Sequence, residues 1–179
     1  MKNKCIVLID GSNFYFKLKG LDLHNLLNFN FSGFVKMLAN NEEIVHATYY
    51  VGKVSTNPQS EKGKKMLANQ QKLFEHLKKH NINYSLGYLL KSDGVYHEKG
   101  VDVNIAVDIL VAAYENLCTR IILISSDTDL LPAIKKAIEK RKILEYVGFS
   151  HQRSYALINV CSKYTLLTKQ NILSFVKEK

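Results

Sequence analysis

Residues 5–13 read CIVLIDGSN, and this stretch decides the fold. Its first five residues are apolar without interruption, which is typical of a strand buried on both faces of a parallel sheet. The Asp-Gly-Ser-Asn that follows indicates a sharp turn into a helix. We therefore expect the chain to begin with a central strand that leaves Asp10 at the carboxyl edge of the sheet, where open α/β proteins bind their ligands.

Strand and helix patterns alternate along the rest of the chain. Apolar, β-branched and aromatic runs predict strands at residues 44–51, 82–90, 120–125, 143–148 and 164–167. Helical spacing of apolar residues predicts helices at residues 14–19, 31–39, 61–80, 101–117, 130–140 and 154–161. Residues 22–30 are ambiguous, and residues 91–100, with a turn signal at Asp93-Gly94, predict an exposed hairpin or loop. The alternation predicts a three-layer α/β/α sandwich with a mainly parallel central sheet.

Length and charge limit the class of protein. The chain has 179 residues, 46% of them hydrophobic, with no linker-like segment or internal repeat, so we expect residues 1–179 to form one domain. Lysine and arginine number 25 against 16 aspartates and glutamates, giving a net charge of +9. A basic surface suits a nucleic acid as partner, although it also serves solubility alone.

Cysteine, histidine and the first residues give no sign of a zinc finger or of export. Cys5, Cys118 and Cys161 are far apart and form no Cys-x-x-Cys pair, so we expect buried thiols in a reducing compartment. The first strand is too short for a signal peptide or membrane span, which predicts a cytoplasmic protein without membrane association. His76 and His80 have an i, i+4 spacing, but their lysine-rich surroundings favour surface residues over metal ligands.

Four aspartates at the ends of the predicted strands or the start of a helix indicate a metal site. Asp10 ends the first strand, and Asp127 and Asp129 follow the strand at residues 120–125. Asp102 falls in the first turn of the helix at residues 101–117, on the stripe that faces the core. Neighbouring carboxylates repel one another unless a cation neutralises them or some are protonated, and oxygen-only ligands favour magnesium or manganese. Asp108 lies about 240° from Asp102 around the helix, so we assign it a supporting role.

Two further features bear on a nucleic-acid partner. The helix at residues 61–80 carries lysines around its apolar positions and is either a solvated outer face or an edge that contacts phosphates. Five tyrosines, Tyr49, Tyr50, Tyr84, Tyr88 and Tyr96, could stack on unpaired bases, although packing in strands or core is the simpler interpretation. A homodimer would extend a basic groove, and the sequence leaves the oligomeric state open.

Three motifs, in this order, resemble those of the NYN domain family, the LabA-like branch of the PIN-like nuclease superfamily, over nearly the whole chain. An aliphatic run followed by Asp-x-x-Asn stands at residues 9–13, Lys-Gly-Val-Asp stands at residues 99–102, and Ser-x-Asp-x-Asp stands at residues 125–129. Ser126 replaces the family's usual glycine and Leu130 its usual phenylalanine, and both departures concern loop geometry more than metal binding.

The resemblance implies a PIN-like, Rossmann-like fold and a magnesium- or manganese-dependent ribonuclease activity on RNA. In this hypothesis Asp10, Asp102 and Asp127 hold one or two ions, and Asp129 completes the shell directly or through water. Several of the supporting residues also suit helix caps, so capping is an alternative to a role at the metal site. Asn13 orients a water, contacts substrate or caps a helix; Lys99 meets a phosphate; Ser125, Ser126 and Thr128 orient carboxylates or cap.

Two other functions remain open from the sequence. A PIN-like domain can hold RNA or a protein partner without cleaving, and the pattern alone does not show that the carboxylates converge. A phosphatase with Asp10 as nucleophile would need a second acid at position 12, which is serine. Phosphate-loop, nucleophile-elbow and dinucleotide fingerprints do not occur in the chain.

Overall fold

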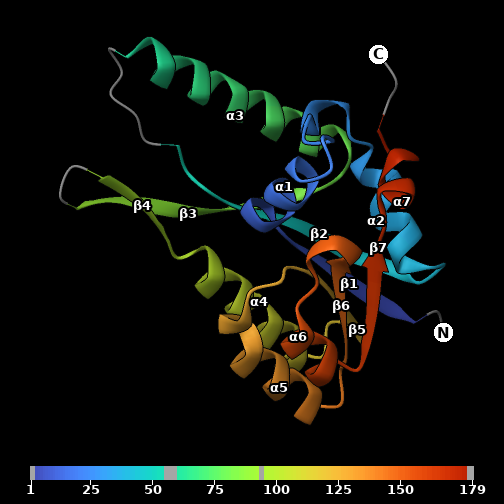
Figure 1. Ribbon diagram of the computed structural model, residues 1–179. Coiled ribbons are helices and arrows are strands. Elements are labelled where there is room, and N and C mark those ends of the chain that lie inside the picture. Colours follow the sequence, from blue (N-terminus) through green and yellow to red (C-terminus); the bar gives the residue numbers. More distant parts are fainter. Residues whose placement is uncertain (1–2, 55–59, 93–94, 177–179) are drawn as a thin grey trace.

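One seven-stranded sheet organises the molecule (Figure 1). The computed structural model describes residues 3–54, 60–92 and 95–176. The strand order is β4-β3-β2-β1-β5-β6-β7. All neighbours pair in parallel except β3 and β4, which form an antiparallel hairpin at one edge. The strands are β1 (Lys4–Asp10), β2 (Glu43–Gly52), β3 (Asn83–Ser92), β4 (Val95–Lys99), β5 (Arg120–Ile124), β6 (Ile143–Phe149) and β7 (Lys163–Leu167).

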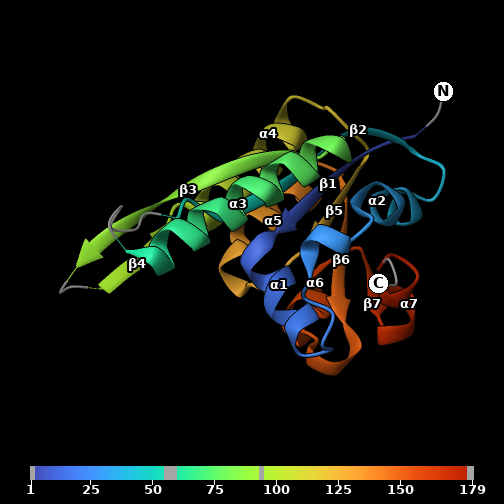
Figure 2. The ribbon, with the colours of Figure 1, turned by 90° about the horizontal axis from the view of Figure 1, so that it is seen from above.

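Helices cover both faces of the sheet, which confirms the predicted three-layer α/β/α sandwich (Figures 1 and 2). One face is covered by α1 (Gly11–Lys19), α2 (Phe31–Ala39), α3 (Glu61–Lys79) and the short α7 (Lys169–Leu173). The other is covered by α4 (Val101–Tyr114), α5 (Leu131–Glu139) and α6 (Tyr155–Val160). Single 3₁₀ turns lie at η1 (Leu26–Asn28), η2 (Thr128–Leu130) and η3 (Ser150–Gln152).

Strand β1 explains why the chain needs two helical layers. Val7 and Ile9 are fully buried against the layer of α1, α2 and α3, while Ile6 and Leu8 are fully buried against the layer of α4 and α5. Alternate side chains of a strand point to opposite faces, so an uninterrupted apolar run is stable only when both faces are covered. The central position that the sequence predicted for this strand is confirmed.

The strand order places a topological switch point beside β1. The chain first moves outward from β1 through β2 and β3 to β4, and then returns through α4 to β5 on the other side of β1. The crevice at the carboxyl ends of two strands whose connections leave in opposite directions is the usual ligand site of open α/β sheets. Asp10 ends β1, and residues 125–129 follow β5, so the acidic motifs stand at this crevice.

A buried ion-pair network fastens the opposite edge of the sheet. Arg120, at the start of β5, donates hydrogen bonds to Glu42 over 2.9 Å, to Glu145, and to the carbonyl oxygens of Leu38 and Ala39. A buried charge is tolerated when several partners satisfy it, and here they come from β6 and from α2 with the segment that follows it. The network therefore joins both halves of the sheet at the edge opposite the four aspartates.

Several local expectations were wrong or incomplete. Helix α4 ends at Tyr114 rather than residue 117, because Asn116 adopts a left-handed backbone with φ of 55° that ends the helix. Helix α7 was not predicted, and the ambiguous residues 22–30 contain η1. The β3–β4 pairing confirms the hairpin alternative, while the predicted turn at Asp93-Gly94 lies outside the described residues.

The cysteines confirm the expectation of buried thiols in two of three cases. Cys5 and Cys118 are buried and free, and Cys161 is half-buried and free. Burial raises the pKa of Cys5 to about 11 and that of Cys161 to about 12.

Within the described ranges, no helix has the length and apolar character needed to cross a bilayer.

Candidate functional site

Asp10 is held firmly at the end of β1. Its carboxylate accepts a hydrogen bond from the Asn13 N–H over 3.0 Å and one from the Ser125 hydroxyl over 2.7 Å, and only 5% of the residue is exposed. Asp10 is thus the N-cap of α1, where the helix dipole also favours a negative charge. The alternative that Asn13 caps this helix was wrong, since Asn13 lies inside its first turn.

Gly11 permits the tight turn that aims Asp10 at the edge. A Cβ at this position would stand 2.3 Å from the Tyr49 ring and 2.5 Å from the Tyr50 carbonyl oxygen. The Tyr49 hydroxyl in turn donates a hydrogen bond to the Gly11 carbonyl oxygen over 3.1 Å. Glycine is required here because the start of α1 lies directly against β2.

The segment after β5 brings the second and third carboxylates. The buried Ser125 hydroxyl accepts a hydrogen bond from the Asp127 N–H over 3.1 Å while it donates to Asp10. The Asp127 carboxylate accepts the Asp129 N–H over 2.8 Å and so caps η2. Ser125 therefore links the ends of β1 and β5. Asp10 and Asp127 serve as helix caps at the same edge of the sheet.

Asp102 completes the set from the helical layer. It lies in the first turn of α4 and is exposed, so the expectation that it faces the core was wrong. Ile105 and Ile109 of the same stripe are fully buried, whereas Asp102, one turn earlier, is exposed. Partial burial raises the pKa of Asp102, and the charges of Asp127, Asp10 and Asp129 raise it further. The four aspartates thus act on one another electrostatically, as neighbouring carboxylates do.

Some of the supporting residues form hydrogen bonds, and others are exposed. Asp108 lies deeper along α4, where its carboxylate accepts a hydrogen bond from the Tyr50 hydroxyl over 2.5 Å. Burial raises the pKa of Tyr50, and the hydrogen bond to Asp108 raises it further. The Ser126 hydroxyl contacts the Tyr146 hydroxyl at 3.1 Å. Lys99 and Thr128 are exposed, Lys99 three residues before Asp102 and Thr128 beside Asp127. Of the predicted supporting side chains, that of Ser125 is hydrogen-bonded to one of the four aspartates.

Comparison with known proteins assigns the chain to a family. The model of the NYN domain matches residues 4–168. The chain belongs to the NYN domain family. The LabA-like subtype stays a prediction. Among curated proteins, none matches the chain.

One solved structure shares the architecture of this NYN domain. A protein of unknown function from Vibrio parahaemolyticus is similar with a TM-score of 0.71 at 22% identity, covering 93% of each chain. Two bacteriophage T5 structures, a 5'-exonuclease with zinc and a flap endonuclease with DNA and metal ions, each have a TM-score of 0.44 at 17% identity. They cover 87% of this chain and 60% and 58% of their own. The first likeness supports the fold, and the other two are too slight to add to it.

The donor chemistry of the NYN site suits a hard divalent cation, but the side chains do not form a closed cage. In the described part of the chain, no group of three or more histidine, cysteine, aspartate or glutamate side chains is arranged to hold a metal. Oxygens of Asp10 and Asp127 instead accept internal hydrogen bonds. Magnesium commonly keeps several waters and binds one or two carboxylates together with substrate phosphates. An open cluster of this kind fits that mode of binding better than a dedicated all-protein site.

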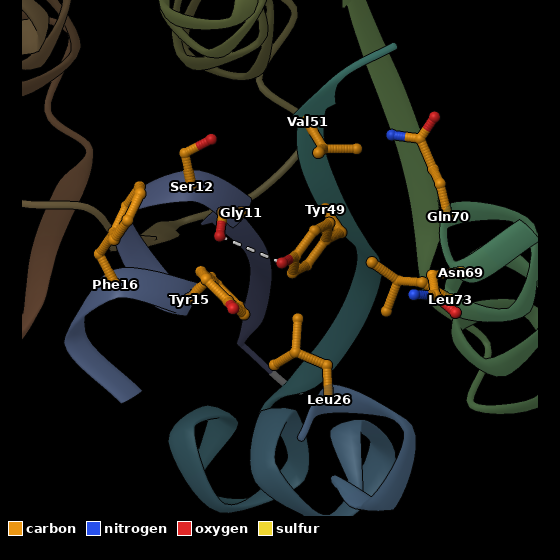
Figure 3. Close-up of a pocket in the computed structure, with 10 residues that line it drawn as sticks. All are labelled: Gly11, Ser12, Tyr15, Phe16, Leu26, Tyr49, Val51, Asn69, Gln70 and Leu73. Atoms are coloured by element: carbon orange, nitrogen blue, oxygen red, sulfur yellow. Dashed lines mark hydrogen bonds between the residues drawn. The ribbon is translucent and has the colours of Figure 1, made fainter. Parts of the chain in front are cut away.

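An apolar pocket of about 280 Å³ adjoins the acidic edge of the NYN domain (Figure 3). In Figure 3 the ring of Tyr49 lies between α1, which carries Tyr15, and α3, which carries Leu73. Its lining comprises Gly11, Ser12, Tyr15, Phe16, Leu26, Tyr49, Val51, Asn69, Gln70 and Leu73. The sequence interpretation missed this pocket. The available signal was the aromatic pair at residues 15–16, directly after the Asp-x-x-Asn motif.

Proposed function

We propose that the protein is a ribonuclease that hydrolyses RNA phosphodiester bonds with the help of a divalent cation at the acidic edge. One observation carries the proposal. At the switch point of the sheet, Ser125 joins the carboxylate of Asp10, at the end of β1, to the segment after β5 that carries Asp127 and Asp129. Burial raises the pKa of Asp102, and the charges of these three aspartates raise it further. Negative charge concentrated in a protein with a net charge of +9 suits a bound cation and a polyanionic substrate.

The residues have distinct roles in this proposal. Asp10, Asp102 and Asp127 hold magnesium or manganese, and Asp129 completes the shell directly or through water. The cation, when bound, lowers the pKa of a water for in-line attack and stabilises the leaving oxygen. The exposed edge position of Asp102 and Asp129 leaves room for a phosphate between them and solvent.

The neighbouring side chains orient the aspartates and attract the substrate. Ser125 keeps the carboxylate of Asp10 and the backbone of Asp127 in a constant relation through its two hydrogen bonds. Asn13 contacts substrate or a water without adding negative charge, and Lys99 offers an exposed cation beside Asp102. Asp108, Ser126 and Thr128 support the segments that carry the aspartates.

A non-cleaving RNA- or protein-binding module is the second candidate, and one observation favours it. Within the described ranges, the acidic side chains do not form a ready coordination group. A module would keep the basic surface and the fold while the aspartates act only as helix caps, which Asp10 and Asp127 do.

A cleavage assay separates the two candidates. Labelled single-stranded RNA is incubated with wild type, Asp127→Asn and Asp22→Asn, in magnesium, manganese or EDTA, and RNA binding is measured in parallel. Asparagine keeps the cap at position 127 but removes its charge, and Asp22 is an exposed residue in the turn after α1.

A ribonuclease loses cleavage in EDTA and in Asp127→Asn, retains it in Asp22→Asn, and binds RNA in every case. The Asp127→Asn variant binds RNA as tightly as wild type or more tightly, because repulsion of the phosphates is reduced. Binding without cleavage by wild type, in either metal, would overturn the proposal in favour of the module.

A further inference from the structure

We propose that the pocket beside Asp10 holds one unstacked nucleobase of single-stranded RNA, with the adjoining phosphate over the acidic edge. This inference rests on the proposed ribonuclease for its substrate class and adds a selectivity for unpaired RNA. It assigns a role to a cavity that the four aspartates do not use.

The size and lining of the pocket match a flat aromatic ligand. Its volume of about 280 Å³ lies just below the range of roughly 300–1,000 Å³ typical of small-molecule sites. One ring system fits such a space, whereas a dinucleotide cofactor does not. Tyr15 and Phe16 supply accessible aromatic surface, and the buried ring of Tyr49 closes the floor. The aliphatic part of the lining comes from Leu26, Val51 and Leu73. Base stacking on aromatic rings is the main sequence-tolerant contact of proteins with single strands.

The wall on α3 is already rigid before any ligand arrives. The side chain of Gln70 is nearly buried; its amide donates to the Gly52 carbonyl oxygen over 2.8 Å and its oxygen accepts the Val54 N–H over 2.9 Å. These bonds fasten α3 to the end of β2. A preformed wall lowers the entropy lost on binding.

The rim combines polar groups with an exposed aromatic ring. Ser12 and the exposed Asn69 line the pocket and place a hydroxyl and an amide where the edge of a base would lie. Phe16, which is 63% exposed, stands at the same opening. An exposed aromatic ring at the mouth of an apolar pocket suits a ligand that stacks on it.

Lysines of α3 flank the pocket where a nucleic-acid backbone would run. Lys65 lies four residues before Asn69 and Lys72 lies three residues after it, so both adjoin the pocket-lining face of α3 on the side of Asn69. Both lysines are exposed. Charge complementarity therefore favours a ligand with phosphates on either side of the inserted group, which distinguishes RNA from a neutral small molecule.

The pocket and the acidic edge are parts of one turn. Gly11 and Ser12 line the pocket and directly follow Asp10 in the chain. The hydrogen bond from the Tyr49 hydroxyl to the Gly11 carbonyl oxygen joins the floor of the pocket to that turn. A base held against Tyr15 in this pocket would thus place its neighbouring phosphate near Asp10. In duplex RNA the bases stay stacked and paired, so this mode requires a single strand.

The test measures binding rather than cleavage. Fluorescence anisotropy in EDTA follows a short labelled single-stranded RNA binding to the Asp127→Asn protein, together with a series in which one nucleotide at a time is abasic. Two pocket variants, Phe16→Ala and Asn69→Trp, are made in the same background, the second filling the opening from an exposed helix position. Tyr164→Ala is the matched control, because Tyr164 is 55% exposed on β7, at the opposite edge of the sheet from β3.

We expect one abasic position to weaken binding about tenfold, the order of one lost base stack. Phe16→Ala and Asn69→Trp should weaken binding of the intact RNA by a similar factor and abolish the dependence on position, while Tyr164→Ala binds as the parent does. Equal affinities across the abasic series would overturn the pocket proposal and leave the ribonuclease standing. Absence of RNA binding by the parent, together with absence of cleavage by wild type, would overturn both.

Discussion

Replacement of Ser125 by alanine tests how the acidic edge is built. Ser125 is 1% exposed, and its hydroxyl donates to Asp10 over 2.7 Å and accepts from the Asp127 N–H over 3.1 Å. The change Ser125→Ala removes a hydrogen bond to a charged group, about 1.5–3 kcal/mol, and one to a neutral N–H, about 1 kcal/mol. We expect a total loss of about 3 kcal/mol in the free energy of unfolding. For a chain of this length, that corresponds to a melting temperature lower by roughly 6–12 °C.

The neighbouring serine provides the control. Ser126 is half-buried and its hydroxyl contacts Tyr146 rather than an aspartate, so Ser126→Ala should cost about 1 kcal/mol or less. Urea unfolding of wild type and both variants, followed by far-UV circular dichroism in EDTA, gives the two differences directly. Cleavage of RNA should fall in Ser125→Ala far more than in Ser126→Ala, because only the first releases Asp10 and Asp127 from each other. Two variants of equal stability, within about 0.5 kcal/mol, would refute this reasoning.

Three further predictions concern other parts of the molecule. Gly11→Ala forces a Cβ to 2.3 Å from the Tyr49 ring, so we expect a loss of about 1–3 kcal/mol in urea unfolding and weaker cleavage; wild-type behaviour would contradict the packing. Arg120→Met leaves buried Glu145 without its guanidinium and should cost about 3–5 kcal/mol, partly restored by adding Glu145→Gln; no restoration would contradict the ion pair. Because the folded-state pKa of Asp102 is raised, its contribution to stability is present at low pH and is lost as the pH rises through that pKa. In EDTA, Asp102→Asn should therefore be more stable than wild type at about pH 7 by a few tenths of a kcal/mol, because the site is largely exposed. The difference should shrink as the pH falls and vanish below about pH 4, as thermal melts can show.

The sheet could be predicted because its signals are local. The apolar runs at residues 5–9 and 121–124 need no distant information to be identified as strands buried on both faces, and both lie at the centre of the sheet. Helix α7 has only five residues, so its pattern is too short to show a period. The end of α4 depends on Asn116 adopting a positive φ, which asparagine permits but does not require.

The positions of the candidate aspartates at the edge of the sheet could be predicted from the sequence, but their local geometry could not. Motif order located the aspartates, since the ends of parallel strands must meet at one edge of a sheet. Helical spacing placed Asp102 on the core stripe, yet Asp102 is exposed, because spacing does not say which residues of the first turn other elements cover. His76 and His80, expected at the surface, are half-buried and hydrogen-bonded to the Phe29 carbonyl oxygen and to Ser32, because α3 packs its last turns against α2. Such contacts depend on how two helices meet and leave no local trace.

The pocket was missed for a similar reason. Tyr49 has the pattern of a strand residue and is indeed buried, so its sequence context predicts a packing role and nothing more. It becomes the floor of a cavity only because α1 and α3 lie apart on that face, with Tyr15 and Leu73 on facing walls (Figure 3). A cavity between two helices depends on how the helices pack, and the pattern of apolar and polar residues in a single strand does not reveal it.

The charges at the edge are the part of this arrangement that the fold itself does not require. Asp10 and Asp127 both act as caps, but asparagine and serine cap about as well as aspartate and bring no charge. Asp102 gains no stability from its ionised form, since burial and three neighbouring carboxylates raise its pKa. Neutral side chains would serve the caps equally and would remove the mutual repulsion. The proposed ribonuclease supplies a physical reason for the negative charge, because a cation bound at the edge would neutralise it and bridge to a substrate phosphate.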